Sequence, residues 1–262
     1  MSNDPRMVDE TDRYRTDRYL EEHPLAHEED SLWKSQVLQP LLDEFVDQTN
    51  ERHVAIMDVG GGAGTVLRLC TEHLSATHGL DIQKILLELS PGLLSRQVST
   101  HGPNAWPILG DVRRLPFSAK SIDLVMLVDV LEHVPEPHLA LEEIARAAHF
   151  AILKVPLERN LYFWAKDRYK RGRFKSMLRN RYGHINDYTY TSLRRQISRH
   201  LGHIIAMRTA NVFAYFGGPN QPGDWTRVDK AMNSVVGSIH SISPRTAARL
   251  SLDFALVLVA CR

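Results

Sequence analysis

The stretch from 54 to 64 constrains this 262-residue chain most, because an apolar run there ends in a turn with four glycines. The run is apolar on both faces except for Asp58, which is typical of a parallel strand covered by helices on both sides. Gly60, Gly62 and Gly64 can adopt positive φ and carry no Cβ, so the backbone can press against a ligand before the next helix begins. The sequence therefore predicts a cradle for a small molecule. The alternative is a tight turn that binds nothing.

Charge and composition exclude several classes of protein. The 32 Lys and Arg residues balance 31 Asp and Glu residues, so the net charge of +1 gives no overall reason to bind nucleic acid or an anionic membrane. Cys70 and Cys261 are too few and too far apart in sequence for a disulfide framework or a zinc cluster. No apolar run approaches the ~20 residues of a membrane span. We expect one soluble, cytoplasmic protein with no membrane partner.

Strand-like and helix-like segments alternate along most of the chain. Apolar residues at helical spacing between 32 and 46 predict a buried helix before the first strand. Three of the strands that follow end in an acid, at Glu88, Asp111 and Asp129. Alternation of this kind is the doubly wound α/β pattern, in which a ligand binds at the carboxyl edge of the sheet. After the strand at 54–59, strands are predicted at 84–89, 106–111, 121–130, 150–155, 204–207 and 252–261.

Two acids compete for the position at the tip of the second strand, where a ribose would bind. Glu88 follows a longer apolar run and precedes a helix start at Ser90-Pro91. Asp81 also follows a strand-like segment and lies nearer the usual distance from the glycines. We prefer Glu88, and Asp81 is the alternative.

Six motifs stand in order between 54 and 156. They are Asp58-x-Gly60-x-Gly62-x-Gly64, Glu88-Leu89-Ser90-Pro91, Gly110-Asp111, Leu115-Pro116-Phe117, Ile122-Asp123-Leu124-Val125 and Leu131-Glu132-His133-Val134. Their order and approximate spacing resemble the class I S-adenosylmethionine-dependent methyltransferases that act on small molecules. A dinucleotide-binding oxidoreductase fits less well, because Thr65 stands where its fingerprint needs a third glycine. One departure is Ala147-Ala148-His149, where the family usually has a Pro-Gly-Gly turn.

The resemblance implies a Rossmann-like, seven-stranded, mostly parallel sheet with helices on both faces, plus N-terminal and lid helices. It implies a single methyltransferase domain over 31–262, with its core at 54–156 binding S-adenosylmethionine. The loop at 60–64 would hold the methionine part of this cofactor. The other implied contacts are Glu88 for the ribose hydroxyls, Asp111 for the adenine amino group, Val112 for the ring through its backbone and Asp129 near the methionine end.

Three segments outside the core are interpreted as cover or contact surfaces. Segment 1–30 carries ten acids against four arginines, and it either folds over the pocket or is a solvated tail. Segment 157–183 interleaves aromatic residues with eight basic ones between Lys166 and Arg181, and it is predicted to be a lid, with an RNA track as the alternative. The insertion at 211–252 indicates substrate cover or a homo-oligomer contact. The substrate candidates are Tyr14, Tyr19, Tyr162, Trp164 and His184.

The expected chemistry is methyl transfer to nitrogen or oxygen of a small molecule. An amine acceptor needs only to arrive unprotonated, whereas a hydroxyl benefits from a base, for which His133 and His184 are the main candidates beside His23 and His27. The residues lean toward nitrogen, and no metal site is predicted. We expect tailoring of a natural product, as in antibiotic biosynthesis. Methylation of RNA or protein is the alternative.

Overall fold

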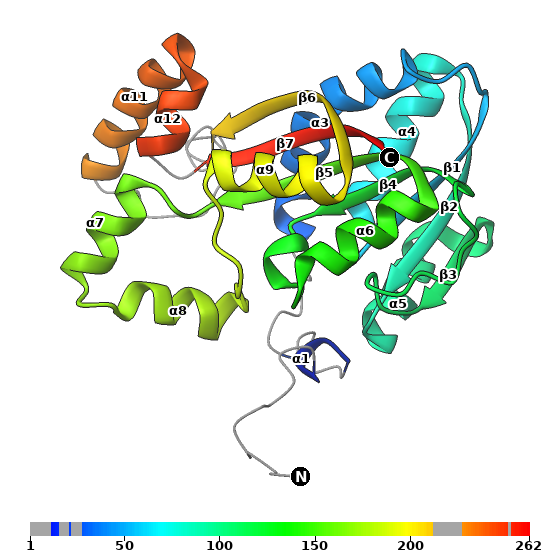
Figure 1. Ribbon diagram of the computed structural model, residues 1–262, viewed down its shortest axis with the longest axis horizontal. Coiled ribbons are helices and arrows are strands. Elements are labelled where there is room, and N and C mark those ends of the chain that lie inside the picture. The colour runs from blue at the N-terminus through cyan, green and yellow to red at the C-terminus, as the bar shows by residue number, and fades with distance from the viewer. Residues whose placement is uncertain (1–11, 16–20, 22–27, 212–226, 251–252) are drawn as a thin grey trace.

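The computed structural model describes residues 12–15, 21, 28–211, 227–250 and 253–262 (Figure 1). Within these residues one seven-stranded sheet has the order β3-β2-β1-β4-β5-β7-β6. All pairs are parallel except those of β7, which lies antiparallel between β5 and β6. The predicted Rossmann-like, mostly parallel fold is confirmed. The strands are β1 (His53–Val59), β2 (Asp81–Glu88), β3 (Ala105–Leu109), β4 (Ile122–Val128), β5 (Ala148–Leu157), β6 (Gly202–Asn211) and β7 (Asp253–Cys261).

Helices cover both faces of the sheet, because successive strand residues point to opposite sides. Ile56 of β1 packs in one core with Phe45 and Leu67, and the next residue, Met57, packs in the core of the other face. Both β1 side chains are fully buried, which explains why the first strand shows no polar face. The first face carries α3 (Ser31–Val46), α4 (Thr65–His78) and α5 (Pro91–His101), and the second carries α6 (Pro137–Ala147) and α9 (Tyr190–His200).

The two acids that were candidates for the ribose contact, Asp81 and Glu88, lie at opposite ends of β2. The strand begins at Asp81, three residues earlier than predicted, and Asp81 bonds His53 with 2.9 Å between Oδ2 and Nδ1. Asp81 pairs in register with the first residue of β1, whereas Glu88 ends the strand. Because β1 and β2 are parallel, Glu88 lies at the carboxyl edge of the sheet and Asp81 lies at the opposite edge.

The segment Ala147-Ala148-His149 contains no turn. Helix α6 ends at Ala147 and β5 begins at Ala148, whose N–H still bonds the carbonyl of Ile144. Both alanines are fully buried. The helix passes directly into the strand, so this chain has no place for the Pro-Gly-Gly turn that the family pattern suggested.

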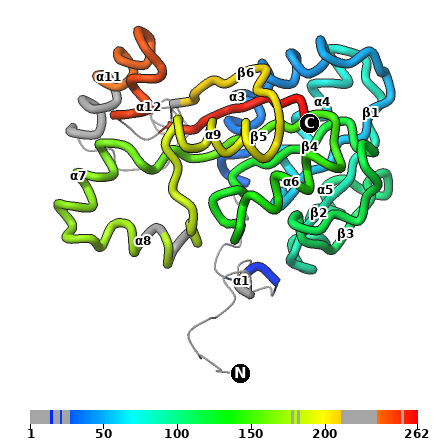
Figure 2. The backbone as a smooth tube through the Cα atoms, viewed as in Figure 1, coloured from blue at the N-terminus to red at the C-terminus, as the bar shows by residue number. Residues whose placement is uncertain are grey.

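Four more helices lie beyond the edge of the core sheet, as Figures 1 and 2 show. Within the predicted lid lie α7 (Leu161–Tyr169) and α8 (Arg173–Tyr182). The predicted insertion contributes α11 (Arg227–Ile242) and α12 (Pro244–Leu250), and α12 contacts α7. Residues 212–226 and 251–252 of the insertion lie outside the described residues, as does most of segment 1–30. None of the described helices is both long and apolar enough to cross a membrane.

Candidate active site

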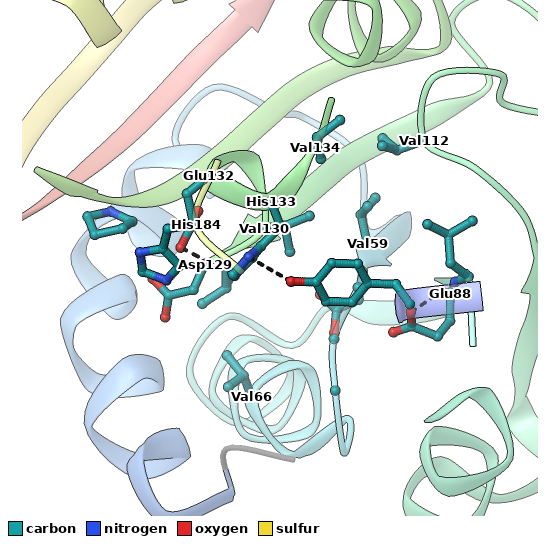
Figure 3. Close-up of a pocket in the computed structure, with 18 of the residues that line it drawn as sticks. Val59, Val66, Glu88, Val112, Asp129, Val130, Glu132, His133, Val134 and His184 are labelled. Carbon is teal, nitrogen blue, oxygen red and sulfur yellow. Dashed lines mark hydrogen bonds and ion pairs between the residues drawn. The ribbon is translucent and has the colours of Figure 1, made fainter. Parts of the chain in front are cut away.

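A cavity of about 560 Å³ opens at the carboxyl ends of the parallel strands (Figure 3). Sites for small molecules typically have volumes of roughly 300–1,000 Å³. One part, here named the glycine half, is lined by Asp58, Val59, Gly60, Gly61, Gly62, Glu88, Leu89, Gly110, Asp111, Val112 and Arg113. The other part, the histidine half, is lined by Tyr14, Lys34, Asp129, Glu132, His133, Glu158, Phe163, Lys166, Phe174, His184 and Phe254.

The glycine turn forms a cradle that excludes side chains. Gly60 and Gly62 have φ of 63° and 59°, and a Cβ on Gly61 would lie 2.0 Å from Oδ2 of Asp58. Asp58 is therefore tucked against the turn, and its Oδ2 has no hydrogen-bond partner in the described part of the chain. Gly64 does not line the cavity. It precedes α4 with φ of 82°, and a Cβ there would lie 3.0 Å from Nε2 of His101.

Glu88 lies beside this cradle at the tip of β2. Its Oε1 accepts the N–H of Leu89 at 2.9 Å, and its Oε2 accepts Nε2 of Gln97 at 3.1 Å. Burial raises the pKa of Glu88 to about 7, and burial together with the charge of Glu88 raises the pKa of Asp58 to about 7. No described Lys or Arg forms an ion pair with either acid, so the glycine half favours a ligand that brings hydroxyl donors or positive charge.

Asp111 closes the glycine half beyond β3. Its Oδ1 accepts the backbone N–H of Arg113 at 2.9 Å and its Oδ2 accepts Nη2 of the same arginine at 2.7 Å. Burial disfavours the charged form, but the hydrogen bonds from Arg113 outweigh it and lower the pKa of Asp111. Val112, which stands between Asp111 and Arg113 in the sequence, also lines the cavity and is buried. Arg113 was not predicted, although its place two residues after Asp111 was a signal.

Asp129 is held between two buried lysines. Lys154 lies 2.5 and 2.7 Å from its two carboxylate oxygens, and Lys34 lies 3.0 Å from Oδ2. Burial opposes ionisation, but the two positive charges lower the pKa of Asp129 well below its usual range. The ammonium of Lys154 also lies 3.4 Å from the ring centroid of Phe254. Neither lysine was predicted, although Lys154 interrupts an otherwise apolar strand, which signals a buried ion pair.

A carboxylate orients His184 in the histidine half. Oε1 of Glu158 lies 2.7 Å from Nδ1 of His184. Because a carboxylate only accepts, Nδ1 carries the proton and Nε2 is the basic nitrogen of the neutral ring. Burial lowers the pKa of His184, but the hydrogen bond to Glu158 and the charges of Glu132 and Glu158 outweigh it, so the pKa is raised. Glu158 was not predicted, and its place just after the last residue of β5 was the available signal.

His133 brings a distant part of the chain into the same half. Its Nδ1 lies 2.9 Å from the hydroxyl of Tyr14 and 3.1 Å from the carbonyl of Gly183. Since the carbonyl only accepts, Nδ1 of His133 is protonated too. The rings of His133 and His184 meet edge to face, with centroids 4.9 Å apart. Tyr14, His133 and His184 thus gather from three separate segments.

Glu132 is buried beside the two histidines (Figure 3). Burial and the nearby charge of Asp129 raise its pKa to about 8, and its Oε2 has no hydrogen-bond partner among the described residues. One possible ligand atom from each of Glu132, His133 and His184 lies within 4.8 Å of the other two. These three atoms are close enough together to bind a metal ion. The sequence had indicated no such group.

Within the predicted lid, the residues that reach the cavity differ from those that the sequence suggested. Phe163 and Lys166 of α7 line it, because residues three apart share a helix face. Trp164 is 64% exposed and borders a separate hollow. Tyr162 is not among the lining residues either, and its hydroxyl lies 3.2 Å from the ammonium of Lys166. Tyr19 lies outside the described residues.

Comparison with known proteins identifies a domain in this chain. The family model described as "Methyltransferase domain" matches residues 57–149, which run from within β1 to the start of β5 and include the glycine half. The chain contains a methyltransferase domain of the class I, S-adenosylmethionine-dependent type over these residues. A comparison with curated protein sequences found no match.

Solved structures show how widely this methyltransferase fold is used. Geranyl diphosphate C-methyltransferase from Streptomyces coelicolor superposes with a TM-score of 0.58 and 11% identity, covering 85% of this chain and 80% of its own. The methyltransferase bound to the Haloferax volcanii activator Trm112 gives 0.56 and 17%, covering 92% and 98%. The cyclase SpnF gives 0.52 and 15%, covering 84% and 79%. At these identities the likeness shows the fold alone.

The glycine half fits the methyltransferase cofactor. S-Adenosylmethionine carries a sulfonium, an ammonium and two ribose hydroxyls. The cradle at Gly61 admits no side chain, and Asp58 and Glu88 are buried acids that form no ion pair within the described chain. Those acids complement the positive charge and the hydroxyl donors of the cofactor.

Proposed function

We propose that this methyltransferase acts on a hydroxyl group of a small molecule and that His184 is the general base. The observation that carries the proposal is the 2.7 Å hydrogen bond between Glu158 and His184 inside the cavity. A nucleophile, a histidine and an acid that orients the histidine form the arrangement by which enzymes remove a proton from a hydroxyl. The aromatic side chains of Tyr14, Phe163 and Phe174 favour a partly apolar acceptor.

In this proposal the glycine half holds the cofactor. Gly60, Gly61 and Gly62 lie along its methionine part, Glu88 accepts the ribose hydroxyls, and Asp111 with Val112 contacts the adenine. Asp129 is already bound to two lysines, so its proposed part is to fix the end of β4 rather than to bind the methionine group directly. When bound, the cofactor supplies an electrophilic methyl group.

The residues of the histidine half then handle one proton. Nε2 of His184 would accept the proton of the acceptor hydroxyl as the oxygen takes up the methyl group that bound S-adenosylmethionine would supply. Glu158 stabilises the resulting imidazolium, as the raised pKa of His184 indicates. The proton leaves to solvent when product departs. His133 holds the neighbouring ring in place, and the aromatic wall keeps water out.

An amine acceptor is the second candidate. The oxygens Oε2 of Glu132 and Oε2 of Glu158 are buried without a hydrogen-bond partner in the described chain, and they could accept from an amine. The raised pKa of Glu132, about 8, argues against a strongly anionic pocket at neutral pH and so favours the hydroxyl. Tailoring of a natural product and a homo-oligomer contact through 211–252 stay predictions.

The test is transfer of a labelled methyl group from S-adenosylmethionine into fractionated small metabolites, RNA and protein. We expect label in a small molecule, in a bond that chemical analysis identifies as a methyl ether. Label on nitrogen would replace the first candidate with the second. Label in RNA, with binding that weakens steeply as salt rises, would overturn the small-molecule proposal.

A further inference from the structure

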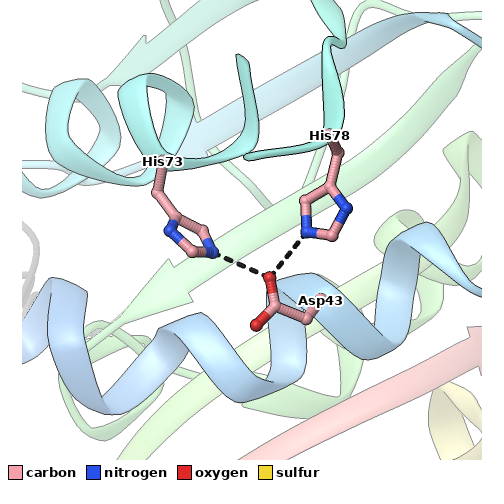
Figure 4. Close-up of side chains that lie close together, drawn as sticks. All are labelled: Asp43, His73 and His78. Atoms are coloured by element: carbon pink, nitrogen blue, oxygen red, sulfur yellow. Dashed lines mark hydrogen bonds and ion pairs between the residues drawn. The ribbon is translucent and has the colours of Figure 1, made fainter. Parts of the chain in front are cut away.

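Two histidines of α4 converge on one carboxylate of α3, on a part of the surface that does not line the cavity (Figure 4). Nε2 of His73 lies 2.7 Å from Oδ1 of Asp43, and Nε2 of His78 lies 2.8 Å from the same oxygen. The side chains are partly accessible, with 19% of His73, 24% of His78 and 45% of Asp43 exposed. Solvent ions can therefore reach the cluster.

The end of α4 makes this convergence possible. His73 and His78 are five residues apart, so a continuous helix would not place them on one line. His78 is the last residue of α4, and Gly79 follows it in the left-handed conformation with φ of 66°. The chain can therefore turn at His78, and its ring reaches the oxygen that His73 contacts. The ring centroids of the two histidines are 6.1 Å apart.

The ligand atoms match the requirements of a divalent transition metal. One atom from each of the three residues lies within 4.8 Å of the other two. Around a tetrahedral zinc ion with bonds of about 2.0–2.2 Å, neighbouring ligand atoms lie roughly 3.3–3.5 Å apart, so small side-chain movements suffice. Two imidazoles and one carboxylate favour zinc over magnesium or calcium, which take oxygen ligands.

A neighbouring hydroxyl supports the tautomer that a metal requires. Oγ1 of Thr77 lies 3.5 Å from Nδ1 of His73, one helical turn away. When Nε2 binds a metal, the proton must reside on Nδ1, and the hydroxyl oxygen of Thr77 is placed to accept a hydrogen bond from this N–H. Such partners of the second ring nitrogen orient histidine ligands in metal sites.

We propose that Asp43, His73 and His78 form a zinc-binding site that fastens the C-terminal end of α4 to α3, with water in the fourth position. Binding requires that both Nε2 protons leave or move to Nδ1, and no bond of the protein is made or broken otherwise. The site is independent of the acceptor proposed for the cavity.

The experiment is calorimetric titration of the untagged full chain with Zn²⁺, repeated with Co²⁺ to record the visible absorption of a four-coordinate ion. His184→Ala is the background, because Glu132, His133 and His184 form the second group of possible ligands among the described residues. We expect one ion per chain in that background and a rise in Tm on adding Zn²⁺. His73→Ala/His78→Ala in the same background should weaken binding at least about 100-fold, since loss of second-shell partners alone costs 10–100-fold.

Two further variants make the result decisive. Asp43→Asn keeps the shape of the cluster but removes its charge, and it should also weaken Zn²⁺ binding. The control is Glu142→Ala, beside His138 and His200, a similar surface cluster whose ligand atoms do not all approach within 4.8 Å. Binding of S-adenosylhomocysteine by each variant shows that it is folded. Unchanged Zn²⁺ binding in the folded His73→Ala/His78→Ala variant, or equal loss in Glu142→Ala, would overturn the proposal.

Discussion

The two halves of the cavity are built in different ways. The glycine half comes from consecutive strand ends between Asp58 and Arg113, and two of its acids, Asp58 and Glu88, form no ion pair within the described chain. The histidine half gathers Tyr14, His133 and His184 from distant segments, and its charged groups already pair with one another. A local motif therefore shapes the part that binds a ligand common to the family. Long-range contacts shape the part that meets an acceptor peculiar to this chain.

The largest expected effect separates turnover from cofactor binding. His184→Ala should lower kcat about 10²- to 10⁴-fold, the usual contribution of a general base, because it removes the proposed proton acceptor. Affinity for S-adenosylhomocysteine should stay within about twofold, since the glycine half is untouched. Methyl-transfer rates and calorimetry measure the two. If the variant keeps most of its activity, the acceptor is more consistent with an amine. The histidine half would then not differ from the glycine half in its effect on turnover.

The converse variant removes the ribose contact from the glycine half. Glu88→Ala should weaken S-adenosylhomocysteine binding at least about tenfold, because hydrogen bonds to a charged group contribute about 1.5–3 kcal/mol. The matched control is Asp81→Ala, which changes an exposed acid at the opposite end of the same strand. Calorimetric titration of both decides the assignment. Weaker binding by the Asp81 variant alone would contradict it.

A smaller effect is expected within the lid. Phe163→Ala should raise KM for the acceptor roughly tenfold, because it removes a buried apolar surface from the cavity wall. Trp164→Ala, the neighbouring position on the exposed face of α7, should leave KM within about twofold. Steady-state kinetics with the identified acceptor measures both. A larger effect at Trp164 would show that the lid takes a different position over the bound acceptor.

The smallest effect concerns stability and pH. The pKa of Glu132 is raised to about 8 in the folded protein. The contribution of Glu132 to the free energy of unfolding is therefore fully present below the ordinary pKa of a glutamate, and it is lost as the pH rises toward 8. Glu132→Gln removes this titration, and its Tm should exceed that of the wild type by a few degrees at pH 8 but not at pH 5. Thermal melts without cofactor measure the difference. An equal Tm at pH 8 would place a stabilising cation or donor beside Glu132.

Sequence patterns predicted the fold and the glycine half because their signals are local. The apolar run before Gly60 and the acid at the end of each strand need only strand alternation to be placed. The histidine half was predicted less well. Nothing local places Glu158 against His184, and the lone Lys154 of β5 did not reveal its partner Asp129, which follows the neighbouring strand β4. The face of α7 was also missed, because aromatic residues stand at both Phe163 and Trp164 and only packing distinguishes them.

The proposed Glu158–His184 base is tested most directly by the pH dependence of kcat/KM in the wild type and in Glu158→Gln. The hydrogen bond and charge of Glu158 help to raise the pKa of His184, and the neutral ring is the active form. Activity of the wild type should therefore rise with pH through a transition above the ordinary value of about 6.5 for histidine. In Glu158→Gln the transition should move to lower pH and the plateau should fall. If the transition lies at the same pH and the plateau of kcat/KM is equal in both proteins, the histidine half does not contain a base that a carboxylate orients.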